Sequence, residues 1–108
     1  MTGSSEDVCV ELVYDSDCPN VDQARANLRG ALRALGLSMN WNEWRSDDPM
    51  IPEHARRRAS PTILVNGRDV GGEEAIDGTA SCRLYATRAG VSGAPDVETI
   101  VAAIRRHS

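Results

Sequence analysis

The chain contains three cysteines, and one of them stands in a context that favours thiol chemistry. Cys18 is followed directly by Pro19, where an apolar strand pattern gives way to an apolar helix pattern. Proline suits the first position of a helix, because its missing N–H group is not needed there. The free amides and the dipole at a helix start favour a negative charge, whereas the carboxylates of Asp15 and Asp17 would oppose a thiolate if they point at the sulfur. The pattern predicts a reactive thiol at position 18; the alternative is a small apolar side chain under the helix.

The spacing after Cys18 excludes one common redox cycle. A Cys-x-x-Cys motif would need a cysteine at position 21, and the residue there is Val21. The segment Cys18-Pro19-Asn20-Val21 is therefore a monothiol motif. It can attack a disulfide, a peroxide or an electrophile, but another thiol must complete the reaction. We interpret Cys82 as the candidate for that second, resolving thiol.

The other cysteines and histidines have alternative interpretations. Cys82 could instead pack in a strand, or it could join Cys18 as a pair of thiolates for a soft metal such as mercury, copper(I) or zinc. Cys9 lies between two valines in a predicted strand and is interpreted as a core residue. His54 and His107 are isolated and lack the spacing of a metal site, so no resident metal or other cofactor is expected.

Composition narrows the classes of protein. The 108 residues carry 12 basic side chains, all arginine, and 16 acidic ones, for a net charge of −4. This acidity argues against nucleic-acid binding, which depends on neutralising phosphates. No apolar run approaches the roughly 18 residues that span a membrane. The polar start lacks the features of a secretory signal. We expect a cytoplasmic protein with a disordered tail at residues 1–7 and one domain at residues 8–108.

Hydrophobic patterning predicts the element order β-α-β-α-β-β-α. The predicted strands cover residues 8–14, 37–42, 62–65 and 68–70, and the predicted helices cover residues 19–35, 51–59 and 97–106. Gly36 is expected to end the first helix, Asn66-Gly67 to form a type I′ turn, and Asp96 to cap the last helix. A glycine-rich insertion, residues 71–95, precedes that helix.

This element order is that of an α/β, thioredoxin-like three-layer fold. The fold also predicts a role for the segment Ser60-Pro61-Thr62. Proteins with this fold place a cis-proline before the hairpin, opposite the active cysteine. The backbone around a cis bond there can align an extended peptide or disulfide substrate. The segment therefore predicts a cis peptide bond at Pro61; the alternative is a trans proline that ends a helix.

The chain resembles a family of small bacterial thioredoxin-like proteins associated with organomercurial (alkylmercury) lyases, some of which carry selenocysteine in place of a cysteine. The resemblance is carried, in order along the chain, by Leu12-Val13-Tyr14, Asp17-Cys18-Pro19-Asn20, Ser60-Pro61-Thr62-Ile63, Val65-Asn66-Gly67-Arg68-Asp69-Val70, Ser81-Cys82-Arg83-Leu84-Tyr85 and Gly90-Val91-Ser92-Gly93-Ala94-Pro95. In this resemblance Cys82 belongs to a recurrent Cys-Arg-Leu-Tyr segment, on an insertion long enough to fold over the active site.

Our first interpretation is a thiol redox protein. Cys18 is the nucleophile and Cys82 the resolving thiol, and the expected substrate contacts are Pro19, Asn20, Ser60, Pro61 and Thr62. The expected partner is a disulfide, a low-molecular-weight thiol or a protein, with no nucleic acid and no membrane.

Two alternatives stay open. One is a protein that binds soft metals or cleaves organomercurials, with Cys18 and Cys82 as ligands and Asp15 or Asp17 as proton donor. The other is a non-catalytic adaptor that uses the fold to hold a partner.

Overall fold

Strand β1 (Val10–Tyr14) lies at the centre of a four-stranded mixed sheet. The computed structural model describes residues 8–56, 58, 60–71, 85–87 and 90–107. The strand order is β2-β1-β3-β4, where β2 is Asn42–Arg45, β3 is Thr62–Val65 and β4 is Arg68–Asp69. β1 runs parallel to β2 and antiparallel to β3, and β3 runs antiparallel to β4. The described residues thus form a small α/β fold.

Helix α1 (Val21–Ala34) buries the apolar stripe that the sequence predicts. Its buried residues are Val21, Ala24, Leu28, Ala31 and Leu32. The helix ends as expected: Gly36 has a φ of 71°, and the Leu37 N–H donates to the Leu32 carbonyl at 2.9 Å. This is the hydrogen bond of a Schellman motif, which glycine favours because it adopts a positive φ without a Cβ clash.

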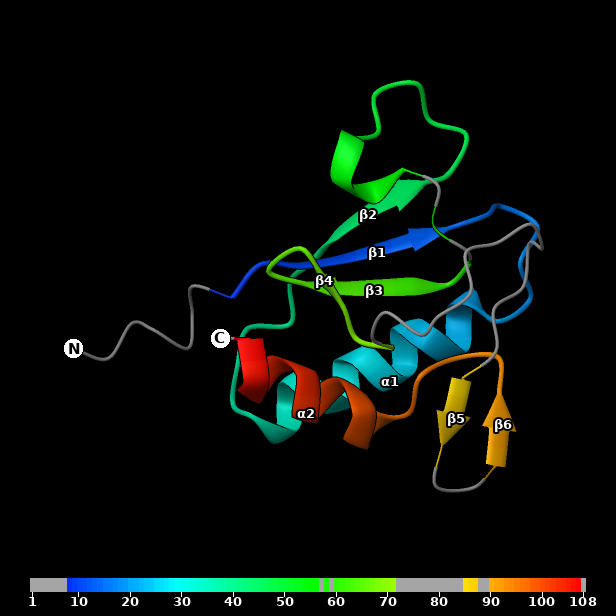
Figure 1. The fold of residues 1–108 in the computed structure, drawn as a ribbon. Helices are drawn as coiled ribbons and strands as arrows, with labels where there is room; N and C mark the ends of the chain where they lie inside the picture. The colour runs from blue at the N-terminus through cyan, green and yellow to red at the C-terminus, as the bar shows by residue number, and fades with distance from the viewer. Residues whose placement is uncertain (1–7, 57, 59, 72–84, 88–89, 108) are drawn as a thin grey trace.

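Helix α2 (Val97–His107) packs beside α1 on the same face of the sheet (Figure 1). The carboxylate of Asp96 accepts a hydrogen bond from the Thr99 N–H at 2.9 Å, which confirms the predicted cap. Ile100 and Ile104 are buried and join the main core, which lies between the two helices and the sheet.

The second predicted strand was wrong in position. Residues 37–41 precede β2, which begins at Asn42. These residues lie in the connection between α1 and β2. Their alternation arises because Leu37 and Trp41 pack against the main core, whereas Met39 is 44% exposed. β2 itself carries a polar sequence, and its Glu43 side chain is held by an arginine of α1, so it lacks the apolar signal of a strand.

The second predicted helix was also wrong. In the described part of this stretch the structure has a single 3-10 turn, η2 (Glu53–Ala55), and both flanking residues, Pro52 and Arg56, are extended. The segment still covers the second face of the sheet, because Ile51 and Ala55 are buried against Val13 of β1 and Leu64 of β3. One face of the sheet therefore carries two helices and the other carries a turn (Figure 1).

The hairpin between β3 and β4 confirms its predicted turn. Asn66 has a φ of 52° and Gly67 a φ of 81°, the left-handed pair that a type I′ turn requires. The Asn66 side chain accepts a hydrogen bond from the Cys9 N–H at 2.9 Å. The interpretation of Cys9 as a core residue was wrong: the strand begins one residue later, and the Cys9 side chain is exposed.

Two further strands form a separate antiparallel pair after residue 84. β5 (Tyr85–Thr87) pairs with β6 (Gly90–Ser92), with Tyr85 opposite Ser92. Cys82, most of the predicted insertion and the predicted tail lie outside the described residues. Within the part that is described, no helix is long and apolar enough to cross a membrane.

Candidate functional site

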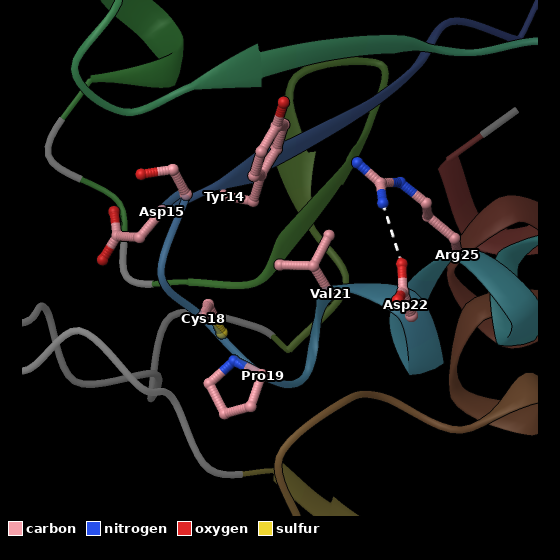
Figure 2. Close-up of a pocket in the computed structure, with 8 residues that line it drawn as sticks. Tyr14, Asp15, Cys18, Pro19, Val21, Asp22 and Arg25 are labelled. Carbon is pink, nitrogen blue, oxygen red and sulfur yellow. Dashed lines mark hydrogen bonds and ion pairs between the residues drawn. The ribbon is translucent and has the colours of Figure 1, made fainter.

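Cys18 lies in the turn between β1 and α1 (Figure 2). Its N–H donates to the Asp15 carbonyl at 3.0 Å, which closes a four-residue turn before the helix. The N-cap of α1 is Asn20, so Cys18 stands two residues before the cap and not at it. Pro19 correspondingly precedes the cap and is exposed, which corrects its expected place at the first helical position. The Cys18 side chain is half-buried and packs against the main core.

A pocket of about 220 Å³ opens beside this thiol (Figure 2). The end of β1, the turn and the first residues of α1 surround it, and its lining residues are Tyr14, Asp15, Ser16, Cys18, Pro19, Val21, Asp22 and Arg25. Cys18 thus faces a space bounded by polar and acidic groups on one side and the helix start on the other. A small disulfide or the tip of a larger substrate fits a volume of this size.

Among the lining residues that the structure describes, Arg25 carries the only positive charge, and that charge is already paired. Its guanidinium donates to both carboxylate oxygens of Glu43 at 2.9 Å and to Asp22 at 3.0 Å. It also lies over the Tyr14 ring, 5.3 Å from the centroid. The hydrogen bonds from Arg25 lower the pKa of Glu43, opposed by burial and assisted by the Trp41 indole. Among the described lining residues, Asp15 is then a carboxylate with no ion-pair partner, so this part of the pocket carries negative charge.

The segment at Ser60-Pro61 lies directly behind the Cys18 turn. The peptide bond between Ser60 and Pro61 is cis, in agreement with the prediction. The Ser60 hydroxyl accepts a hydrogen bond from the Asp15 N–H at 3.0 Å, and the Asp15 side chain accepts one from Ser46. The structure therefore joins the two segments that the sequence marked as chemically relevant, although they are 45 residues apart.

This segment is buried, which limits what it can contact. Ser60 is 1% exposed and Thr62 0%, and the Pro61 side chain is also fully buried. Ser60 holds the turn through its hydrogen bond to Asp15, whereas Pro19 is exposed and Asn20 is half-buried. Direct substrate contact by Ser60, Pro61 and Thr62 stays a prediction.

Two residues of the site were missed by sequence reasoning, Tyr85 and Gly93. The buried Tyr85 side chain donates its hydroxyl hydrogen to the Pro61 carbonyl. A Cβ atom at Gly93 would lie less than 3.0 Å from the side-chain amide of Asn20. Both residues fall within the segments that carry the family resemblance, but no local pattern indicates partners so far away in the chain.

A second polar cluster lies on the opposite face of the sheet. Glu11, in β1, is 5% exposed, and its carboxylate accepts a hydrogen bond from Trp44 at 2.9 Å. The Nε2 atom of His54 lies 2.9 Å from both Glu11 oxygens, so this histidine is not isolated as the sequence suggested. No group of three or more His, Cys, Asp or Glu residues that could hold a metal ion is found within the described ranges.

The pairing of Cys18 with Cys82 lies outside the described residues, and neither the redox nor the soft-metal interpretation of that pair is tested by the structure. Comparison of the chain with protein-family models, curated proteins and solved structures gave no match.

Proposed function

We propose that the chain is a thioredoxin-like protein that exchanges disulfides, with Cys18 as its nucleophile. The observation that carries the proposal is the hydrogen-bonded link between the Cys18 turn and Ser60, the residue before Pro61. The strand order β2-β1-β3-β4 and the strand directions are those that a thioredoxin-like core would have. The absence of a cysteine at position 21 makes the reaction a monothiol one.

The chemistry follows from a single thiolate. Cys18 Sγ attacks one sulfur of a disulfide R–S–S–R′, forming Cys18–S–S–R and releasing R′S⁻, which takes up a proton. When a second thiolate attacks Cys18 Sγ, RS⁻ leaves and Cys18 is held in a disulfide with that second thiol; when it attacks the neighbouring sulfur, Cys18 leaves as a thiolate and takes up a proton. Cys82 or a low-molecular-weight thiol supplies that second thiolate. Two electrons pass in total from the thiols to the substrate disulfide.

The residues around Cys18 have separate roles in this reaction. The hydrogen bond from the Cys18 N–H to Asp15 fixes the thiol at the mouth of the pocket. The side chain of Asn20 makes no capping hydrogen bond, so the first amides of α1 are left to interact with negative charge near the turn. Pro19 is exposed beside the thiol and forms the outer wall that a substrate would meet.

A comparison between two cysteines of the same chain tests the proposal. One variant, Cys9→Ser/Cys82→Ser, retains only Cys18, and its matched control, Cys18→Ser/Cys82→Ser, retains only the exposed Cys9. Both are treated with hydroxyethyl disulfide, and the mixed disulfide is followed by mass. We expect half-buried Cys18 to react about tenfold faster than Cys9, because the free amides at the start of α1 favour negative charge near Cys18. Equal or slower reaction at Cys18 would overturn the proposal.

The resolving thiol needs its own experiment. If Cys82 resolves the mixed disulfide, the Cys82→Ser variant accumulates the Cys18 adduct, and the unmodified chain forms a Cys18–Cys82 crosslink on mild oxidation. If the adduct decays at the same rate in both proteins when no external thiol is present, Cys82 is not the resolving thiol. An external thiol then takes that role.

A further inference from the structure

We propose that Tyr85 is a positioning residue for disulfide exchange at Cys18. Its hydroxyl acts through Pro61 and Ser60 on the turn that holds the thiol. This inference rests on the proposed function and adds a part of the chain, β5, that the reaction scheme does not otherwise use.

Three hydrogen bonds and the peptide link between Ser60 and Pro61 connect Tyr85 to Cys18. The Tyr85 hydroxyl donates to the carbonyl of Pro61, the residue bonded to Ser60. The Ser60 hydroxyl accepts from the Asp15 N–H at 3.0 Å, and the Asp15 carbonyl accepts from the Cys18 N–H at 3.0 Å. Tyr85 and Ser60 are 5% and 1% exposed. Buried hydrogen bonds of this kind hold their groups more firmly than exposed ones, because water cannot replace a lost partner.

The segment that follows β6 also contacts the start of α1, two residues after Cys18. Gly93 directly follows β6, and the Asn20 side-chain amide occupies the space that a Cβ would need. β5 and β6 pair with Tyr85 opposite Ser92, so both contacts come from the same end of this two-stranded unit. The Pro95 carbonyl accepts a hydrogen bond from Asn27 of α1 at 2.9 Å, which fixes the following segment to the helix.

Positioning matters for this reaction because exchange requires three sulfur atoms in line. Small errors in the placement of a reacting group lower the rate of a well-oriented reaction strongly. Alkylation by a small reagent such as iodoacetamide is less demanding, because that reagent approaches the thiol from many directions. Loss of the Tyr85 hydroxyl should therefore slow exchange with a substrate held in the pocket much more than it slows alkylation.

The test uses Tyr85→Phe, which keeps the ring in the core and removes the hydroxyl. All proteins carry Cys9→Ser and Cys82→Ser, so that Cys18 is the only thiol that reacts. The exchange probe is the disulfide dimer of acetyl-Ala-Cys-Ala-amide, and the second probe is iodoacetamide. We expect Tyr85→Phe to lower the exchange rate about five- to tenfold and the alkylation rate less than twofold. Ile104→Val, which weakens the core of α2, is the control: it should lower Tm without changing the ratio of the two rates.

A double-mutant cycle tests the route through Ser60. Ser60→Ala removes the acceptor for the Asp15 N–H. If Tyr85 acts through Ser60, the double variant exchanges no more slowly than the slower single variant. If the double variant instead slowed exchange by the product of the two single effects, the route through Ser60 would be overturned. An unchanged exchange rate in Tyr85→Phe, or an equal loss of exchange and alkylation, would reduce Tyr85 to an ordinary core residue. Failure of the proposed function itself would appear in the comparison of the two single-cysteine variants. There Cys18 would react no faster than Cys9, although Tyr85 and Ser60 are unchanged.

Discussion

The side-chain amide of Asn20 lies against Gly93, in the space where any other residue at position 93 would place its Cβ. Asn20 is the N-cap of α1 and follows Cys18 by two residues. The segment after β6 therefore limits where the start of the helix can lie, and the glycine is required by this close approach.

Gly93→Ala should disturb this contact in a way that a second substitution repairs. We expect the added methyl group to displace the Asn20 amide and to lower the free energy of unfolding by about 1–3 kcal/mol, as overpacking does. Asn20→Ala removes the clashing amide, so the double variant should be more stable than the sum of the two single effects. Urea denaturation of the four proteins measures the coupling. Simple additivity would show that the two residues do not constrain each other.

The negative pocket should select substrates by charge. Arg25 is paired with Glu43 and Asp22, so within the described part of the lining no cation compensates the carboxylate of Asp15 beside Cys18. At low salt we expect Cys18 to react several-fold faster with the dication cystamine than with the dianion dithiodipropionate. The difference should shrink at about 0.5 M salt, where charges are screened within a few ångströms.

Two variants separate this local effect from the net charge of the protein. Asp15→Asn should reduce the preference for cystamine, whereas Glu53→Gln, in the η2 turn on the other face of the sheet, should leave it unchanged. The two variants change the net charge equally. An identical shift in both would attribute the preference to overall charge.

The pairing of Glu43 with Arg25 predicts a stability change in acid. Hydrogen bonds from Arg25 lower the pKa of Glu43 in the folded protein. A lowered carboxyl pKa stabilises the fold fully above the unfolded value, about 4.3, and this stabilisation is lost as the pH falls through the folded value. Glu43→Gln should therefore be less stable near neutral pH by about 1 kcal/mol and should lose less stability on acidification. Urea unfolding at neutral and acidic pH measures both effects; parallel pH profiles would contradict the prediction.

Local signals explain which parts of the fold the sequence predicted. The apolar stripe of α1, the cap at Asp96 and the Asn66-Gly67 turn depend on neighbouring residues, and all three are confirmed. The strand at 37–42 and the helix at 51–59 were wrong because apolar residues there pack from irregular segments, as Trp41 and Ile51 do.

The site was predicted in part. The sequence indicated the Cys18 turn and the Ser60-Pro61 segment, because cysteine and proline are informative residues at such junctions. It did not indicate the contacts of Tyr85 and Gly93, which join positions far apart in the chain and depend on how the elements pack. The hydrogen bond between Asp15 and Ser60 is of the same long-range kind.

The buried carboxylate of Glu11 gives a prediction for the other face of the sheet. Glu11→Ala removes the acceptor of the Trp44 indole and the partner of His54, so we expect a loss of about 1–3 kcal/mol in the free energy of unfolding. Glu11→Gln retains an acceptor oxygen and should cost less. Thermal or urea unfolding of the two variants gives the comparison. If the alanine variant were as stable as the glutamine variant, these hydrogen bonds would contribute nothing to stability.

The outer strands of the four-stranded sheet bear on how the protein behaves at high concentration. β2 ends the described sheet on one side and carries the charged side chains of Glu43 and Arg45, and β4 ends it on the other with only two residues, Arg68 and Asp69. Short, charged outer strands disfavour the addition of a strand from another molecule. Both outer strands of the described sheet therefore disfavour strand pairing between molecules, and with it aggregation.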